Sequence, residues 1–519
     1  MTSGPSHPAE PLVLGVDIGS GGPKVGYVRV TGEPEWWWYE RTDILAGSEH
    51  QDANVWWETI VAAARRGLSE GVDPNRVKGI AISGQWASTV PVDAAGVPVG
   101  DCLMWTDTHG AKHSAERFGG PVAGYDARVL ATWIRRSGGV PSYTGSDPIS
   151  HMLHLLNDRP EVTERARWFL EPVDYLAMRF TGRASASAMS MTAAWLTDNR
   201  NLDKHEYDAK LVRMAGVDPA YLPPLVPAAS LIGSIQPAVA DLIGLPHDVQ
   251  VVTSLPDLHT SAVSAGAIHQ GEAHISLGTS AWVSCPVPRK KTDIIKQMAS
   301  VPGLGVGPKY IIANNQDNAG RCLEWYRANM AAGQEYDELV AEAARVAPGS
   351  DRVLFTPWLS GERSPIDDRH ARGGFHNLSL DTTQGHLTRA VLEGVALNLR
   401  WLLGPTEKFA GTRFDTIRLM GGGARIDLWC QILADVLNRR LERVAEPLLG
   451  GLRGCGIYFG LAAGLVDPEH VRDLIPLDGT FTPNPESTVI YDELFPQFTG
   501  LYTNIKSFFR TLNRPPRRQ

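Results

Sequence analysis

The chain has 519 residues, and its 49 Lys and Arg residues against 57 Asp and Glu residues give a formal net charge of −8. This length predicts roughly two to four domains. Because affinity for a nucleic-acid backbone depends on clustered positive charge, the acidic balance argues against a nucleic-acid partner. Hydrophobic residues make up 43% of the chain, but no apolar run reaches the roughly 18 residues of a membrane-spanning helix. We therefore expect a packed, multi-domain protein that binds neither nucleic acid nor a membrane.

The cysteines and the N-terminus indicate the compartment. The five cysteines lie far apart and include no CxxC pair, which disfavours a disulfide framework or a zinc ribbon and suits a reducing environment. Residues 1–11 contain no Lys or Arg and no apolar core of a signal peptide. We therefore expect a cytoplasmic protein.

Several common catalytic motifs are missing or stand in the wrong context. Gly-Lys never occurs, which excludes a Walker A loop, and GxGxxG and HExxH are also missing. The one GxSxG, residues 67–71, follows a helical pattern, whereas a nucleophile elbow needs a strand before its serine. The pairs His109/His113 and His151/His154 have helical spacing, but no nearby carboxylate or cysteine completes a ligand set, so we expect structural histidines.

From the N-terminus, the first predicted element is a β-hairpin over residues 12–30. An apolar run ends in Asp17, a glycine-rich turn follows, and a β-branched pattern then resumes. Residues 56–68 carry helical periodicity, and residues 77–83 read as a buried strand.

The middle of the chain repeats this plan. A proline-rich stretch over residues 219–227 is typical of a connection. A buried strand over residues 249–253 then leads towards Asp257. Residues 273–284 form a second predicted hairpin with the turn Gly278-Thr279-Ser280. Two hairpins of one kind, one in each half, predict two related domains that face each other.

The second half alternates helices with a strand. Apolar stripes over residues 389–403 and 428–437 predict two helices. Between them, a strand over residues 415–420 runs into Gly421-Gly422-Gly423-Ala424. This alternation indicates an α/β fold.

Both hairpin turns and the second glycine-rich segment suit a nucleotide. Turns without bulky side chains expose backbone N–H groups that can cradle phosphates. Asp17 offers the oxygen ligands that Mg²⁺ prefers, and Lys24 can neutralise phosphate charge. The absence of side chains at 421–423 lets a flat ligand approach the backbone. Each feature alone is also typical of an ordinary tight turn.

Asp257 precedes a small-residue segment that is expected to begin a helix. An aspartate in that place is often only a helix cap. The functional alternative is a general base for a substrate hydroxyl, acting through its position and not through a raised pKa, because phosphoryl transfer depends mainly on alignment.

Together these motifs resemble the FGGY carbohydrate kinase family, and among its members the xylulokinases. The resemblance implies an α/β architecture of two ribonuclease-H-like (actin-like ATPase) domains, residues 1–252 and 253–519, with the active-site cleft between them. In chain order it is carried by Asp17-Ile18-Gly19-Ser20 with Lys24, Gly84-Gln85, Trp105 with Asp107, Asp257, Gly278-Thr279-Ser280, residues 359–365, residues 389–396, Gly421-Gly422-Gly423-Ala424, and Glu446 with Gly451.

The resemblance also implies an activity, which is transfer of the γ-phosphoryl group of ATP to a hydroxyl of a ketose such as xylulose. Asp257 would be the catalytic base and touch the acceptor, and Asp17 would bind Mg²⁺. The other acceptor contacts it implies are Gln85, Trp86, Trp105 and Asp107. The nucleotide contacts it implies are Asp17, Gly19, Ser20, Lys24, Gly278, Thr279, Ser280, Gly421, Gly422, Gly423 and Ala424. Kinases of this type are often dimers, so a homodimer is a further expectation by analogy.

Departures from the xylulokinase pattern concentrate on the acceptor side. Trp86-Ala87-Ser88 stand where xylulokinases have Met-His-Gly, and His109 stands where they have arginine. Residues 254–256 replace glycines before Asp257, and a threonine-aspartate pair expected after Gly182 is missing. Two alternatives therefore stay open: a kinase for a different sugar or polyol, and a catalytically silent sensor of sugar and nucleotide.

Overall fold

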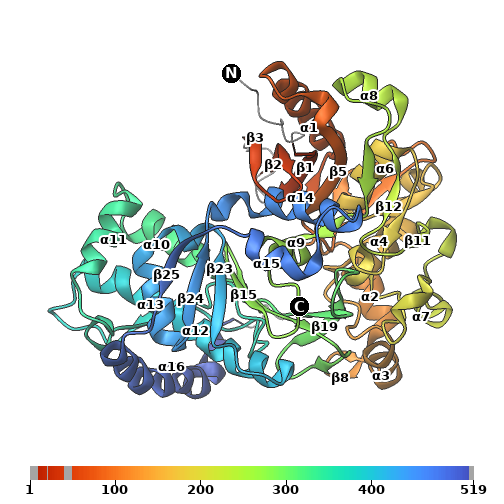
Figure 1. Ribbon diagram of the computed structural model, residues 1–519. Helices are drawn as coiled ribbons and strands as arrows, with labels where there is room; N and C mark the ends of the chain where they lie inside the picture. Colours follow the sequence, from red (N-terminus) through yellow and green to blue (C-terminus); the bar gives the residue numbers. More distant parts are fainter. Residues whose placement is uncertain (1–9, 20–21, 40–48, 514–519) are drawn as a thin grey trace, which may run out of the picture.

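The computed structural model describes residues 10–19, 22–39 and 49–513. Two α/β halves lie on either side of a shared central layer (Figure 1). None of the helices in these described ranges is long and apolar enough to cross a membrane.

The N-terminal half is built on a seven-stranded mixed sheet. The strands run in the order β12-β13-β5-β1-β2-β3, and β14 pairs with β5 beyond β13. Their bounds are β1 Leu12–Gly19, β2 Gly22–Arg29, β3 Pro34–Tyr39, β5 Val77–Gly84, β12 Leu231–Ser234, β13 Gln250–Val252 and β14 Leu255–Pro256. The predicted first hairpin is confirmed, because β1 pairs with β2 in antiparallel register.

From Leu12 to Val16 the strand β1 is apolar on both faces, as is typical of a strand that is buried on both sides. Leu14 and Val16 belong to the core shared with α1 (Ala53–Ser69) and α6 (Pro172–Thr181). Val13 faces the other way, into a core shared with the C-terminal half.

The C-terminal half repeats the plan in a five-stranded sheet of order β16-β15-β23-β24-β25. Both sheets combine an antiparallel hairpin with neighbouring parallel strands and end on an antiparallel strand. The bounds are β15 Ala273–Leu277, β16 Ala281–Ser284, β23 Thr416–Met420, β24 Arg440–Val444 and β25 Leu477–Phe481. This repetition confirms the prediction of two related halves.

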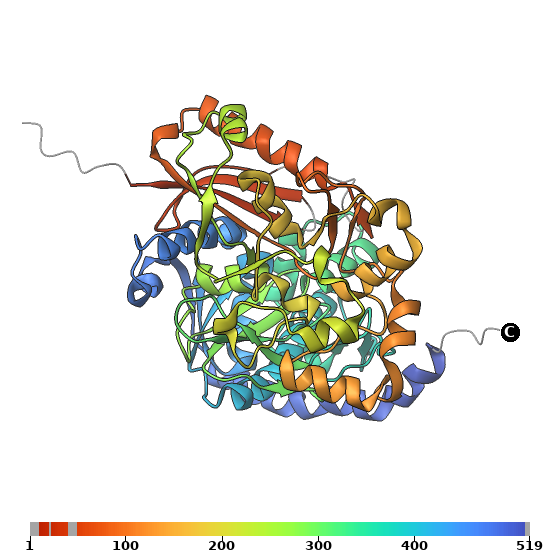
Figure 2. The same ribbon diagram turned by 90° about the vertical axis from the view of Figure 1, so that its right-hand side faces the viewer.

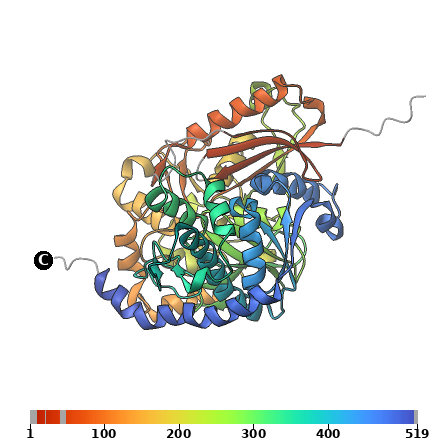
Figure 3. The ribbon, with the colours of Figure 1, turned by 90° about the vertical axis from the view of Figure 1, so that its left-hand side faces the viewer.

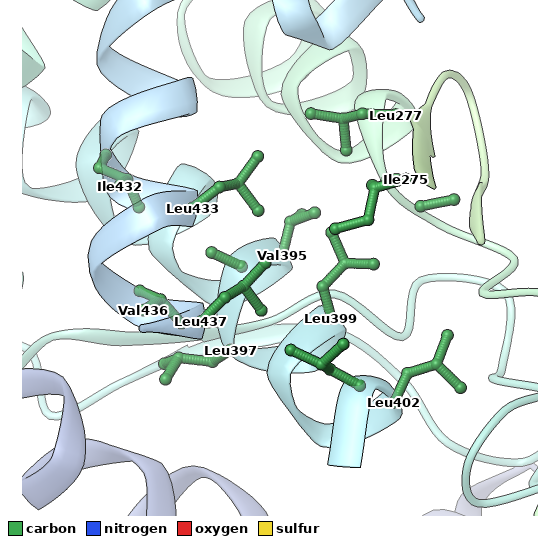
Figure 4. Close-up of a cluster of buried hydrophobic side chains, with 14 of the residues drawn as sticks. Ile275, Leu277, Val395, Leu397, Leu399, Leu402, Ile432, Leu433, Val436 and Leu437 are labelled. Atoms are coloured by element: carbon green, nitrogen blue, oxygen red, sulfur yellow. The ribbon is translucent and has the colours of Figure 1, made fainter. Parts of the chain in front are cut away.

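Two helices, α12 (Gln384–Ala410) and α13 (Asp427–Leu437), pack on the second sheet. A third helix, α16 (Pro485–Leu512), packs on α12 and α13. Figure 4 shows Val395 of α12 between Leu433 of α13 and Ile275 of β15, within one buried hydrophobic cluster. The helix α16 runs along the edge of the molecule in Figure 3.

Two helices from the C-terminal half form the shared central layer. They are α9 (Asp257–Ser264) and α14 (Gly450–Ala462), which pack against each other. The helix α14 also packs on β1, β2 and β5. Residues of β1 and β5 are therefore in one hydrophobic core with residues of α9 and α14.

A smaller helical lobe extends the N-terminal half and is best seen in Figure 2. It contains α2 (Ala111–Phe118), α3 (Ala127–Arg136), α4 (Pro148–Asp158) and α7 (Ala209–Ala215), which have a core of their own. The serine of the GxSxG sequence, Ser69, is the last residue of α1 and bonds the carbonyl of Arg66, so no nucleophile elbow exists there.

Candidate active site

Three parallel strands of the first sheet end in line. Ile18 of β1 and Pro256 of β14 are both in register with Gly84 of β5. The residues that follow, Gly19, Gln85 and Asp257, consequently leave the sheet at the same edge. The backbone N–H of Gln85 donates to the carbonyl of Ile18 at 3.1 Å. The carboxyl ends of parallel strands are where α/β sheets bind ligands.

Asp17 and Lys24 face each other across the first hairpin. They are register partners on β1 and β2, and Lys24 Nζ lies 3.3 Å from Asp17 Oδ2. Both side chains are partly buried, so the charges lie at the rim of the edge and remain accessible. Gly19 is at the end of β1. Ser20, the other predicted contact of this turn, lies outside the described residues.

Asp257 is the first residue of α9, and its Oδ1 accepts a hydrogen bond from the backbone N–H of Leu258 at 2.7 Å. Burial raises the pKa of its carboxyl group to about 7, and the negative charge of Asp17 acts in the same direction. The expectation that this aspartate acts without a raised pKa is therefore wrong. Burial depends on the packing of α9, which the sequence pattern around Asp257 does not reveal. An aspartate with this pKa can hold or release a proton near neutral pH.

The second hairpin turn and the glycine-rich segment also lie together. Ser276 of β15 pairs in parallel with Met420 of β23, so Gly278 and Gly421 leave the second sheet side by side. Gly421 has a φ of +94°, and a Cβ there would lie 2.6 Å from the carbonyl oxygen of Leu277. Only glycine fits this junction.

Beyond it, the backbone is open to a ligand on one side. Gly422 and Gly423 begin a short 3₁₀ turn, with Gly422 exposed and Ala424 buried. The carbonyl of Gly278 accepts a hydrogen bond from the N–H of Gly320, and this bond fixes the hairpin turn to the start of α10 (Gly320–Met330). Thr279 and Ser280 complete that turn, and Thr279 is exposed.

The start of α14 connects the two sheet edges. A Cβ at Gly450 would lie 2.5 Å from Met420 Cε, and one at Gly451 would lie 2.2 Å from Asp17 Oδ2. The helix thus touches the end of β23 with one residue and the end of β1 with the next. Sequence reasoning included Gly451 only as part of a family pattern and missed Gly450. The signal that could have found both is the Gly-Gly pair at the start of a helical segment.

Of the residues predicted to contact the acceptor, Gln85 is buried, and its Oε1 has no hydrogen-bond partner among the described residues. The loop after it is held from both sides: Ser88 N–H donates to Glu171 Oε2 at 3.1 Å, and Trp105 N–H donates to Ser88 Oγ at 3.1 Å. The Trp105 side chain is 41% exposed. A buried, unpaired amide oxygen and an exposed indole on the next segment of chain both suit a ligand with hydroxyl groups.

Trp86 and Ala87 of the same loop have unusual surroundings. Trp86 packs against the cluster of Leu258 in the C-terminal half, and its ring meets His259 edge-on at 6.4 Å between centroids. Ala87 takes a φ of +61°, a left-handed conformation that non-glycine residues adopt rarely and mostly at functional sites. Trp86 therefore links the loop after β5 to the helix that begins with Asp257.

Asp107 is buried and is bonded to two histidines. His50 Nε2 lies 2.8 Å and His109 Nδ1 lies 2.7 Å from Asp107 Oδ2. Burial favours a higher pKa for Asp107, but the hydrogen bonds from His109 and His50 outweigh it and lower the pKa. The hydrogen bond and charge of Asp107 raise the pKa of His109.

The expectation that no carboxylate accompanies the histidines is wrong. Asp107 pairs with His109, while Asp158 Oδ2 lies 2.7 Å from His113 Nε2 and 2.9 Å from His154 Nδ1. Only the contact between His113 and Asp158 joins segments that are distant in sequence. Asp107 lies two residues before His109 and Asp158 four residues after His154, so a search of the neighbouring positions could have found both carboxylates.

Comparisons with known proteins agree with this arrangement. The N-terminal and C-terminal domain models of the FGGY family of carbohydrate kinases match residues 12–264 and 273–455. A xylulose kinase of Lactococcus lactis is 27% identical, over 95% of this chain and 96% of that protein. A gluconokinase of Bacillus subtilis is 26% identical, over 96% of this chain and 98% of that protein.

Solved structures are similar over the same length. A gluconate kinase and a xylulose kinase, both from Lactobacillus acidophilus, each have a TM-score of 0.84 and 20% identity. They cover 97% of this chain and 99% and 100% of their own chains. At this identity the likeness concerns the fold, and it confirms the predicted two-domain α/β architecture.

Proposed function

The chain belongs to the FGGY family of carbohydrate kinases, and from that premise we propose that it phosphorylates a ketose such as xylulose, with Asp257 as the catalytic base. The observation that carries the proposal is the alignment of three strand ends, which brings the first phosphate turn, Gln85 and Asp257 to one edge of a sheet.

The nucleotide would lie between the two sheet edges that α14 connects. Its adenosine would rest on Gly422, Gly423 and Ala424, where the backbone of Gly422 is exposed. Its phosphates would lie against the turn Gly278–Ser280 and the turn at Gly19, with Lys24 neutralising part of their charge. Backbone N–H groups in such turns are well suited to hold phosphate oxygens.

The acceptor would lie on Gln85, Trp105 and Asp107, with one hydroxyl directed at Asp257. The buried Oε1 of Gln85 would accept a hydrogen bond from the acceptor. Asp257 would then take the hydroxyl proton while the hydroxyl oxygen forms a bond to the γ-phosphorus. The bond between the γ-phosphorus and the β,γ-bridging oxygen would break at the same time, which releases ADP. A base with a pKa of about 7 is half deprotonated near neutral pH.

The residues at the first turn fit a magnesium ion. The carboxylate of Asp17 is partly exposed, and Mg²⁺ in kinases is commonly held by one or two carboxylates together with water and phosphate oxygens. Bound beside Asp17, Mg²⁺ would neutralise negative charge on the phosphates. Lys24, which pairs with Asp17 in this structure, would then be shared between that carboxylate and the nucleotide.

A second acceptor class is a sugar acid, and a specific observation favours it. Relatives of similar identity include gluconokinases as well as xylulose kinases. The imidazoles of His50 and His109 beside Asp107 could offer hydrogen bonds to a carboxylate end of the acceptor. Another sugar or polyol, and a catalytically silent sensor, are the remaining alternatives.

An acceptor screen tests these candidates. ADP release is followed with ATP and Mg²⁺ across pentuloses, hexuloses, polyols and aldonic acids, with the Asp257→Asn protein as the blank. We expect the highest kcat/KM with a ketose. A preference for gluconate would replace that proposal with the sugar acid. ATP binding without turnover of any acceptor would support the sensor.

A further inference from the structure

A group of three potential metal ligands lies on the acceptor side, apart from the phosphate turns. His50, Asp107 and His109 each offer one ligand atom, and these atoms all lie within 4.8 Å of one another. Both imidazole nitrogens are directed at the same oxygen, Asp107 Oδ2, at 2.8 and 2.7 Å. Because the three atoms converge on one point, an ion could replace the protons that they now share.

Short-range contacts hold the ligands in place. His50 is in the two-residue strand β4 (His50–Gln51), which pairs with β7 (Cys102–Leu103) just before Asp107. The second carboxylate oxygen, Asp107 Oδ1, accepts from the N–H of His109 at 3.0 Å. This bond fixes the carboxylate and leaves Oδ2 directed at both imidazoles. Such anchoring of first ligands by further hydrogen bonds is typical of metal sites.

A second observation points to a ligand here. His151 on α4 is fully buried, and its Nε2 has no hydrogen-bond partner among the described residues, while its Nδ1 lies 3.3 Å from Thr89 Oγ1. The charge and the backbone of Asp107 both act on its pKa, as does the charge of His50, so the ring lies against the Asp107 segment of the group. The backbone at Gly110 packs so tightly on this helix that a Cβ there would lie 2.0 Å from Ser150 O. A buried polar atom without a well-formed hydrogen bond favours an additional partner such as water or an ion.

We propose that His50, Asp107 and His109 bind one divalent first-row transition-metal ion, of the Zn²⁺ or Co²⁺ type. Two imidazoles and one carboxylate suit such an ion, whereas Mg²⁺ prefers oxygen ligands alone. The imidazole of His109 is 52% exposed and that of His50 is 33% exposed, so further coordination positions face solvent. The site therefore has the open form of a metal centre that can also take water or a hydroxylated ligand.

Zinc titration of the full-length, chelator-treated protein tests the site. Calorimetry is expected to find one saturable Zn²⁺ equivalent, and Co²⁺ should give the visible absorption of a bound ion. Removal of one ligand in His50→Ala or His109→Ala should weaken binding by about 100-fold or more, since even second-shell changes cost about 10–100-fold. The matched control is His113→Ala. His113 pairs with Asp158 and not with Asp107, so its removal should leave Zn²⁺ binding unchanged.

The outcomes are separable from the kinase proposal, because binding is measured without nucleotide or acceptor. Three results would overturn the proposal. The wild-type protein could show no saturable binding, the His50 and His109 variants could bind Zn²⁺ as tightly as the wild-type protein, or the His113 control could lose as much affinity as they do. Thermal unfolding of each variant checks its fold. His109 lies on an exposed turn, so its variant keeps the test decisive even if the His50 variant unfolds.

Discussion

The carboxylate of Asp17 lies against the backbone of Gly451, with so little room that a Cβ at Gly451 would be 2.2 Å from Asp17 Oδ2. Asp17 lies near the end of β1, two residues before Gly19, and Gly451 is the second residue of α14, a helix from the other half of the chain. The positive end of a helix dipole favours a carboxylate at its N-terminus. The orientation of Asp17 therefore depends on a residue 434 positions away being glycine (451 − 17).

The first prediction is that Gly451→Ala displaces Asp17 and lowers kcat by about 100-fold, the usual effect of a misplacement of about 1 Å near the reacting groups. The matched control is Gly500→Ala, because Gly500 is also helical, in α16, and nothing lies within 4 Å of a Cβ there. That control should keep full activity and gain up to about 1 kcal/mol in the free energy of unfolding. Steady-state kinetics and chemical denaturation measure both. Equal kcat in the two variants would contradict the importance of this contact.

Asp257→Asn should lower kcat by about 100- to 10,000-fold, because the acceptor hydroxyl loses its base. The KM for ATP should change little, since the nucleotide contacts are on other elements. Asp126→Asn is the control, because Asp126 caps α3 and is exposed. Its variant should lose at most about 1 kcal/mol of stability and no activity. If Asp257→Asn retained wild-type kcat, Asp257 would be a structural cap only.

The pH profile should report the same carboxyl group. Because the pKa of Asp257 is raised to about 7 and the deprotonated form is the base, kcat/KM should fall as the pH falls through 7. The Asp257→Asn protein should lack this limb, while any titration of ATP itself remains in both profiles. A limb that persists unchanged in the variant would assign it to another group. Stability has the opposite sense, since a raised carboxyl pKa favours the folded state at lower pH and that contribution is lost as the pH rises towards 7.

Gln85→Leu should separate acceptor binding from folding. The buried Oε1 of Gln85 has no partner among the described residues, so its removal should leave the free energy of unfolding unchanged or raise it by about 1 kcal/mol. The KM for the acceptor should rise by about 10-fold or more, because a hydrogen bond to the acceptor is lost. The KM for ATP serves as the internal control. An unchanged acceptor KM would mean that Gln85 does not contact the acceptor.

The architecture was predictable because its signals are local. Two hairpins with glycine-rich turns and a strand ending at residues 421–423 each lie within a short window of sequence. The alternation of strand and helix predicted the α/β class, and the motif order gave the family.

The surroundings of the candidate site were not predictable in this way. His50 reaches Asp107 through a pairing of only two residues on each strand, which leaves no periodic pattern. Trp86 packs on Leu258, which is more than 170 positions away in the sequence, and the pKa of Asp257 depends on burial. These features arise from tertiary packing, which sequence spacing alone does not encode.

Because α14 covers the first sheet, the N-terminal half of the chain depends on the C-terminal half for its solubility. One face of β1 and β5 is covered by a helix that the ribosome completes only near residue 462. Until then Val13 and Ala81 have no helix α14 to pack against, so the nascent N-terminal half exposes an apolar face of its sheet. A protein split at residue 264 would accordingly become soluble only when both fragments are produced together.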